Sequence, residues 1–285
     1  MSETIRIQNL STGLMTDADS FVFDGTNGTR RISYPNLKSA ITSDIQSQIE
    51  PLIYNNAGAH NAIYRGKSLG TSVTDTQWAA ISAGTFEDMY IGDYWTINSK
   101  VYRIAAFDYY LNCGDTATTK HHVVLIPDTS MYSAQMNTSN TTEGGYVGSA
   151  MYTANLATAK TTITSAFGSA HILSHRIYLC NAVSSGRPSG GAWVDSTVDL
   201  MCEQMVYGSN IQAPMSYGSG IVNYKVEKSQ LPLFALNHSL ISIRTTWWLR
   251  DVVTAAYFAL VYPTGLADFY YASASFGVRP AFCIS

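Results

Sequence analysis

Residues 247–284 read WWLRDVVTAAYFALVYPTGLADFYYASASFGVRPAFCI, and this stretch decides the fold class. It holds four short apolar or aromatic runs, at 247–249, 257–262, 269–271 and 278–284, which glycine and other small residues separate. Aromatic and β-branched residues favour strands, and no helical spacing continues past Trp247. The stretch therefore predicts a run of strands and loops at the C-terminal end of the chain.

Upstream of this stretch, strand and helix patterns are mixed. Thr74 and Gln77 have the spacing of a capping box and lead into a short helix, and Tyr94–Ile97 is predicted to pair with Val101–Ile104 across Asn98-Ser99. Two more helices are predicted where apolar residues recur at helical spacing before a glycine: Leu156, Ala159, Ile163 and Phe167 before Gly168, and Val198, Met201, Cys202, Met205 and Val206 before Gly208. The predicted fold class is α+β.

Residues 1–59 differ from the rest and are predicted to be an oligomerisation segment; attachment is implied only by the resemblance described below. A helix begins near Pro35, and its apolar residues recur at every fourth position: Leu37, Ile41, Ile45, Ile49 and Ile53. A single narrow apolar stripe needs a partner surface, so we expect copies of the chain to associate through it. The alternative is that the stripe packs on its own domain. Residues 55–59 are predicted to be a linker, and residues 60–285 one domain.

Composition and charge exclude several functional classes. The chain has 285 residues, 46% of them apolar, which is enough for a large core. Only 13% are charged, the net charge is −3 and no basic run occurs, which disfavours nucleic-acid binding. No apolar run reaches the length of a membrane span and residues 1–10 lack a secretory signal, so we expect no membrane insertion and synthesis in the cytoplasm.

The sequence shows no pattern of a metal site or of common catalytic motifs. The four cysteines lie at positions 113, 180, 202 and 283, too far apart for a CxxC ligand pair. Four buried free thiols are the expected state, with two disulfides as the alternative. No GxGxxG, GxxxxGK[ST], GxSxG or HExxH motif occurs.

Three groups of titratable residues are the candidate sets of metal ligands. His121 and His122 are neighbours, which a strand would point to opposite faces. His171 and His175 would share one face of a helix, but no third ligand follows. One face of the predicted helix would carry Asp195, Asp199 and Glu203. Such a face could attract a cation, but acidic residues at this spacing ordinarily lie on a face exposed to solvent. We therefore expect no metal, no cofactor and no enzymatic activity.

The last 34 residues have an unusual composition. Tyr, Phe, Ser, Ala, Thr and Gly predominate from Val252 to Ser285, and the only charged residues are Asp268 and Arg279. Tyrosine among small residues is typical of binding loops, because it offers a large amphipathic contact area with few rotatable bonds. The alternative is a β-rich core in which alternate aromatics face inward. Phe269, Tyr270 and Tyr271 are consecutive and cannot all face one core in an extended chain, which favours binding.

Several segments resemble the C-type-lectin-fold proteins that phages and prophages carry. They are WWLRD at 247–251, AYFA at 256–259 and SASFGVRPAF at 273–282, together with HNAIYRGK at 60–67, GTF at 84–86, GDYW at 92–95 and residues 124–128. This family includes receptor-binding proteins diversified by retroelements, such as the major tropism determinant of a Bordetella phage. The resemblance covers about residues 60–285.

The resemblance implies a C-type lectin fold, also described as formylglycine-generating-enzyme-like, with a variable region at about 250–285. The implied ligand-binding positions are Tyr262, Pro263, Thr264, Leu266, Asp268, Phe269, Tyr270, Tyr271 and Phe276. Gly265, Ala267, Ala272, Ala274 and the frame Gly277-Val278-Arg279-Pro280 would be scaffold. The variable positions would share one solvent-facing surface.

The implied function is host recognition by a phage or prophage tail-tip protein that binds a bacterial surface protein or glycan. The N-terminal segment would attach to other tail proteins, the usual assembly would be a homotrimer, and the protein would be part of the virion. One alternative is a structural virion or cell-surface protein with a fixed tail. Another is an oxidase of the formylglycine-generating kind, for which the sequence has no local cysteine pair.

Overall fold

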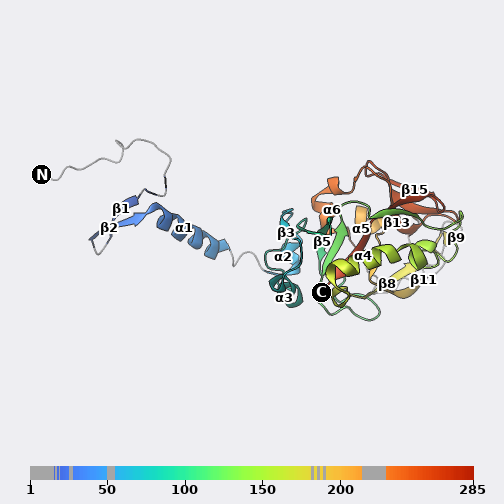
Figure 1. Cartoon of the computed structure of the whole chain (residues 1–285), viewed down its shortest axis with the longest axis horizontal. Coiled ribbons are helices and arrows are strands. Elements are labelled where there is room, and N and C mark those ends of the chain that lie inside the picture. The colour runs from blue at the N-terminus through green and yellow to red at the C-terminus, as the bar shows by residue number, and fades with distance from the viewer. Residues whose placement is uncertain are drawn as a thin grey trace. The chain divides into compact units, whose positions relative to one another are not determined.

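The chain forms two compact units, Met1–Tyr54 and Asn55–Ser285 (Figure 1). The structure is a computed structural model and describes residues 16, 18, 20–25, 28–49, 55–180, 183–184, 187–188, 191–213 and 229–285.

The smaller unit contains a hairpin and a helix. Strands β1 (Ser20–Gly25) and β2 (Gly28–Ser33) are antiparallel, and α1 (Tyr34–Ile49) follows directly, with Pro35 in its first turn. The helix was predicted and the hairpin was not, because its strands carry no clear alternation. The side chains of Ile41 and Ile45 are each 51% exposed and Leu37 is half-buried, so the described part of the unit leaves these two isoleucines of the stripe largely uncovered. Ile53 and the side chain of Ile49 lie outside the described part of the chain.

The larger unit is mixed α and β, with more sheet than helix. Its helices are α2 (Ala57–His60), α3 (Asp75–Ala83), α4 (Ala157–Phe167), α5 (Glu203–Tyr207) and α6 (Pro232–Leu236), with a π-helical segment at Met151–Asn155 and 3-10 turns at Ser169–His171 and His238–Leu240. The α+β class is confirmed.

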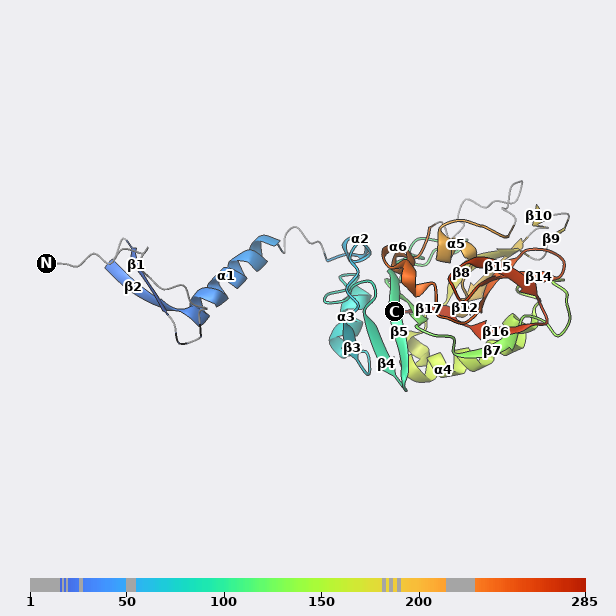
Figure 2. The same cartoon turned by 90° about the horizontal axis from the view of Figure 1, so that it is seen from above.

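Two sheets hold most of the strands described in this unit (Figure 2). The first has the order β12-β17-β6-β5-β4-β3, with bounds β12 Val198–Leu200, β17 Pro280–Ile284, β6 Val123–Pro127, β5 Lys100–Phe107, β4 Tyr94–Ile97 and β3 Ser68–Gly70. The second has the order β15-β14-β13-β16-β7, with bounds β15 Ala267–Tyr271, β14 Tyr257–Val261, β13 Trp247–Val252, β16 Ser275–Val278 and β7 Tyr132–Gln135. The C-terminal run of strands is therefore as predicted, shared between both sheets.

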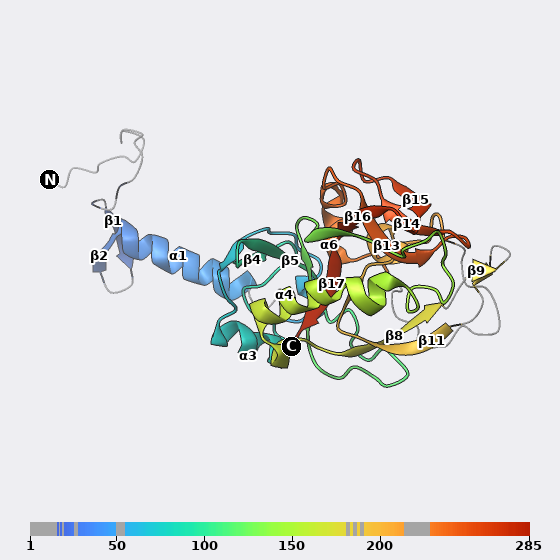
Figure 3. The same ribbon diagram turned by 45° about the vertical axis from the view of Figure 1, so that its right-hand side comes forward.

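Two short hairpins complete the unit. Strands β8 (His175–Cys180) and β11 (Gly191–Ser196) are antiparallel, and so are β9 (Val183–Ser184) and β10 (Arg187–Pro188). Figure 3 shows β8 and β11 on one side of the larger unit and the β13–β16 sheet on the other.

Local signals placed several elements correctly. Thr74 caps α3 in a complete capping box with Gln77, and Gly84 ends the helix in the left-handed conformation. Asn98 and Ser99 have φ of 48° and 61°, as a two-residue hairpin turn requires, and join β4 to β5. Helix α4 ends at Gly168 as expected.

Two predictions about elements were wrong. The expected linker at 55–59 instead begins α2, because the Asn56 side chain caps this helix by accepting a hydrogen bond from the Ala59 N–H. The expected helix at 198–206 is strand β12 followed by the short helix α5. Val198–Leu200 pairs with β17, Val198 opposite Phe282, and this long-range pairing outweighs the helical spacing.

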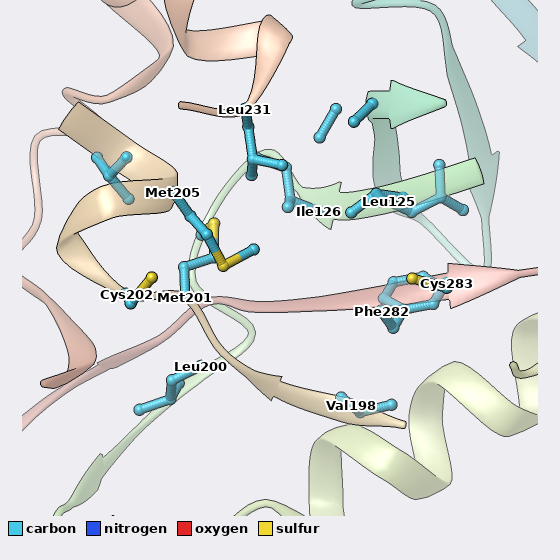
Figure 4. Packing of buried hydrophobic residues seen from close by; sticks show 14 of the residues in the cluster. Leu125, Ile126, Val198, Leu200, Met201, Cys202, Met205, Leu231, Phe282 and Cys283 are labelled. Atoms are coloured by element: carbon cyan, nitrogen blue, oxygen red, sulfur yellow. The ribbon is translucent and has the colours of Figure 1, made fainter. Parts of the chain in front are cut away.

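The core of the larger unit lies between the sheets and the helices. Its largest fully buried side chains include Trp95, Trp247, Trp248, Tyr102 and Phe258. Figure 4 shows one part of this core, where Leu125 and Ile126 of β6 and Phe282 of β17 lie in one cluster with residues of β12 and α5.

Candidate functional site

The candidate recognition surface is built on the β14–β15 hairpin. Three residues, Pro263, Thr264 and Gly265, close its turn, and the Tyr262 N–H donates to the Leu266 carbonyl over 2.8 Å. Gly265 has a φ of 90°, a conformation that glycine adopts at little cost and that ends a three-residue hairpin loop. Strand β15 is an edge of its sheet, so one side of the hairpin has no neighbouring strand among the described residues.

Aromatic rings collect at the end of the hairpin away from this turn. On one side of β15, Tyr257 contacts Phe269 and Tyr271, with ring centroids 5.3 and 4.6 Å apart. On the other side, Tyr270 contacts Phe276 at 5.5 Å. The Tyr270 and Tyr271 rings also meet edge to face at 5.8 Å, so the two groups are continuous. We call these five residues, Tyr257, Phe269, Tyr270, Tyr271 and Phe276, the aromatic cluster.

The nine predicted ligand-binding positions fall into two groups along the hairpin. Tyr262, Pro263, Thr264 and Leu266 form the turn, where Tyr262, Thr264 and Leu266 are exposed and Pro263 is half-buried. Asp268, Phe269, Tyr270, Tyr271 and Phe276 lie along β15 and β16, where Tyr270 and Tyr271 are exposed and the other three are half-buried. A strand of five residues separates the turn from Tyr271, roughly 17 Å at the rise of an extended chain. The structure therefore brings the second group together and leaves the turn at a distance.

The aromatic cluster rests on a buried scaffold. Phe276 contacts the fully buried Trp248 with centroids 5.0 Å apart, and the Trp248 Nε1–H donates to the Ala134 carbonyl over 2.9 Å. Arg279 is also fully buried, donates to the carbonyls of Pro127 and Leu240, and lies over the Trp247 ring. Burial lowers the pKa of Arg279 to about 10, which still leaves it charged at neutral pH.

Gly277 in β16 allows a close approach that no other residue would. A Cβ atom at this position would lie 2.1 Å from the Ser130 Oγ and 3.0 Å from the Thr246 carbonyl oxygen. We expect Gly277→Ala to destabilise the protein by about 1–3 kcal/mol, the usual cost of overpacking. Thermal unfolding measures this, with Ala274→Gly as a control nearby. An unchanged midpoint for Gly277→Ala would contradict the packing described.

The aromatic cluster carries little charge. Asp268 accepts a hydrogen bond from the Phe269 N–H over 2.8 Å, and Arg279 is buried, so tyrosine hydroxyls supply most of the polarity. A hydrogen bond with Tyr271 raises the pKa of Tyr257 above its usual value. The Tyr257 ring therefore stays neutral at physiological pH, and the surface suits a partner that offers apolar contacts and uncharged hydrogen-bonding groups.

Sequence reasoning missed three residues at this site. The sequence places Tyr257 on a strand, but its pairing with Tyr271 depends on the register of β14 and β15. The Asn140 side chain accepts from the Ser273 hydroxyl over 2.6 Å and ties the loop at 137–142 to the β15–β16 connection. The aromatic at 257 was a usable signal, whereas no local pattern pointed to Asn140 or Ser273.

The histidine and aspartate groups do not form metal sites. His121 and His122 both contact Asp108, His121 through Nδ1 over 2.7 Å and His122 through its backbone N–H over 2.9 Å. His171 lies in a 3-10 turn and His175 in β8, so the two do not share a helix. Asp195, Asp199 and Glu203 lie on β11, β12 and α5, and the predicted common face does not exist. Within the described residues no group of three or more potential ligands surrounds a common point.

The cysteines differ from the expectation at one position. Cys202 and Cys283 are buried, as expected, but Cys113 is half-buried. Figure 4 shows Cys202 beside α5 and Cys283 on β17, separated by packed side chains. The side chain of Cys180 lies outside the described part of the structure.

Among the described helices, none has the length and apolar character needed to cross a membrane.

Comparison of the chain with protein-family models, with curated proteins and with solved structures finds no match. The proposed function therefore rests on the residues and their arrangement.

Proposed function

We propose that this chain is a receptor-binding protein of a phage or prophage tail tip, and that its aromatic cluster binds a molecule on a bacterial surface. The observation that carries the proposal is a contrast in exposure: two tyrosines of this cluster are exposed, whereas the tryptophan that the cluster packs against is buried. Tyr270 and Tyr271 are 49% and 43% exposed, while Trp248, which contacts Phe276 of the same cluster, is fully buried. A rigid scaffold under exposed aromatics is the arrangement that tolerates substitution at the surface and retains the fold.

The finer parts of the proposal rest on the sequence resemblance. Under it, the larger unit has a C-type lectin fold, and the nine positions from Tyr262 to Phe276 are diversified by a retroelement. The ligand is a bacterial surface protein or glycan, no cofactor takes part, and the protein acts in the virion. The mixed α+β class and the C-terminal strands are compatible with this fold.

Genomic sequencing tests the diversification directly. We expect a near-copy of the 3′ end of the gene close by, beside a reverse-transcriptase gene, with adenines at the codons of the nine positions. Independent isolates should differ at those codons and agree at Gly277 and Arg279. A fixed 3′ end across isolates that infect different hosts would favour a structural protein with an invariant tail.

We also propose that the smaller unit forms a homotrimer through α1 and attaches to other tail proteins. Ile41 and Ile45 are half-exposed apolar residues four positions apart, and burial against identical helices would remove them from water. We expect the full-length protein to have three times the 31.1 kDa mass of one chain, and Ile45→Asp to shift it to monomer.

Light scattering after size exclusion measures this mass. Ser43→Asp is the matched control, because it adds the same charge to the same helix off the stripe, and it should leave the trimer intact. A monomeric parent protein, or an unchanged mass for Ile45→Asp, would contradict the proposed trimer.

A further inference from the structure

The turn of the β14–β15 hairpin carries exposed apolar side chains of its own, away from the aromatic cluster. Leu266 is 65% exposed and Tyr262 is 48% exposed, and Ile211, in the loop that follows α5, is 52% exposed. Figures 1 and 3 show this hairpin in red at the upper edge of the larger unit. We call Ile211, Tyr262 and Leu266 the turn patch.

A hydrogen bond places Ile211 beside the turn. The Gln212 Nε2–H donates to the Ala267 carbonyl at the start of β15, over 3.2 Å. Ile211 and Leu266 are the chain neighbours of these two residues, and Tyr262 pairs with Leu266 across the turn. Exposed apolar side chains that gather at one place are typical of interaction surfaces.

A buried carboxylate fixes the loop that carries Ile211. Glu203 in α5 is fully buried, and its two carboxylate oxygens accept hydrogen bonds from the backbone N–H groups of residues 211–213 over 2.9–3.0 Å. Hydrogen bonds to an ionised group are among the stronger ones in proteins. Three of them to consecutive N–H groups hold this loop in one conformation.

Two hydroxyl groups hold the turn itself. The Tyr207 hydroxyl donates to the Gly265 carbonyl over 3.0 Å, and the Ser242 hydroxyl donates to the Pro263 carbonyl over 2.7 Å. The backbone on both sides of the turn patch is therefore fixed before any partner arrives. Such pre-organisation lowers the entropic cost of binding.

The turn patch and the aromatic cluster are connected along β15. Side chains alternate along an extended chain, so Leu266, Asp268 and Tyr270 point to the same side, and Leu266 lies roughly 13 Å from Tyr270. A protein–protein interface of standard size buries about 800 Å² on each partner, which corresponds to a patch roughly 30 Å across. One protein partner can therefore cover both groups.

The chemistry of this surface favours a protein over a glycan. The side chains of Ile211 and Leu266 have no polar atoms, and the half-buried Asp268 is the only charged residue from Tyr257 to Phe276. Sugar hydroxyls buried against aliphatic side chains would lose their hydrogen bonds to water without replacement, which is unfavourable. Apolar side chains of a protein would be buried there at no such cost.

We propose that the partner of this recognition surface is a folded bacterial surface protein, which binds the aromatic cluster and the turn patch together. Ile211 is then a contact residue outside the nine predicted ligand-binding positions. This inference rests on the proposed receptor function and narrows its ligand from a protein or glycan to a protein.

The first test uses bacterial strains that the full-length parent protein binds. The cells are treated with proteinase K or with periodate, which cleaves sugar diols, before the protein is added. We expect protease treatment to abolish binding and periodate treatment to leave it unchanged. Binding that survives protease, or that is lost after periodate, would overturn the inference and leave the proposed receptor function standing.

The second test uses Ile211→Ser on the same strains. We expect it to melt like the parent and to bind about tenfold more weakly, because it removes apolar surface from the interface. Ile63→Ser is the matched control, since Ile63 is 41% exposed and lies outside the hairpin, and it should bind like the parent.

Two results with Ile211→Ser would overturn the inference. If its binding is undiminished while Tyr270→Ser/Tyr271→Ser binds weakly, the aromatic cluster acts without the turn patch, and only the receptor function stands. If light scattering shows a smaller assembly for Ile211→Ser than for the parent, a second copy of the chain covers the turn patch instead of a bacterial protein.

Discussion

Trp248→Ala is expected to lower the free energy of unfolding by about 3–5 kcal/mol, the cost of removing a large buried aromatic side chain. Trp248 is fully buried, donates a hydrogen bond to the Ala134 carbonyl and supports Phe276 from below. At about 2–4 °C per kcal/mol for a domain of this size, the thermal midpoint should fall by roughly 10 °C. Calorimetry or circular dichroism of the full-length protein measures this shift.

The matched control for this result is the double variant Tyr270→Ser/Tyr271→Ser. Both side chains are exposed, and substitutions at exposed sites usually change stability by about 0.5 kcal/mol or less. The control should therefore melt close to the parent protein. If it melts as early as Trp248→Ala, the aromatic cluster belongs to the core and is not a displayed surface.

Acid is expected to destabilise the protein through His175. Its pKa is about 3 in the folded state, against 6.5 for an unperturbed histidine in the unfolded chain, so between these values the unfolded chain binds a proton that the folded chain does not. The contribution of His175 to the free energy of unfolding is then fully present above pH 6.5. Below that pH it falls by about 1.4 kcal/mol per pH unit, a loss of roughly 4–5 kcal/mol by pH 3. Urea unfolding at a series of pH values measures this dependence.

His175→Phe isolates this contribution from those of other groups. Burial also lowers the pKa of His60 and His122, which act in the same direction, and raises the pKa of Asp199, whose protonation acts in the opposite one. The free energy of unfolding of the parent minus that of the variant should therefore decrease steadily as the pH falls from 6.5 towards 3, by about 1.4 kcal/mol per pH unit. A difference that stays constant with pH would show that His175 is not buried in its neutral form.

The parts of the fold that sequence predicts well depend on neighbours in the chain. Thr74 and Gln77 cap a helix three residues away, and Asn98-Ser99 closes a two-residue turn, so local chemistry settles both. Val198–Leu200 has helical spacing too, but its strand partner is near Phe282, and only the folded chain brings the two together.

For the candidate site, the sequence could predict that aromatic side chains reach the surface, but not which residues they contact. Three consecutive aromatics at 269–271 correctly indicated that some of them reach the surface, since a strand cannot face them all inward. The contact of Tyr257 with Tyr271 depends on strand register. The hydrogen bond from Ser273 to Asn140 joins residues that are 133 positions apart in the chain. No pattern within a short window of sequence carries that information.

The ion pairs of Arg176, the neighbour of His175, illustrate the same limit. Asp115, Arg176 and Asp195 lie on three separate segments, and their ion pairs follow from the pairing of β8 with β11. The sequence pattern suggested His175 only as a helical partner of His171, and its burial as a neutral imidazole stacked on Tyr110 follows from the packing of the folded chain.

The most direct test of the proposed receptor function is the binding of purified full-length protein to a panel of bacterial strains. Parent protein, Tyr270→Ser/Tyr271→Ser and the control Ile63→Ser/Tyr64→Ser, whose side chains are similarly exposed, are compared on the strains that the parent binds. We predict that the Tyr270/Tyr271 variant melts like the parent but binds at least about 30-fold more weakly, since aromatic anchors commonly contribute ~2 kcal/mol or more, and that the control binds normally. Undiminished binding of the Tyr270/Tyr271 variant, or no binding of the parent to any strain, would contradict the account.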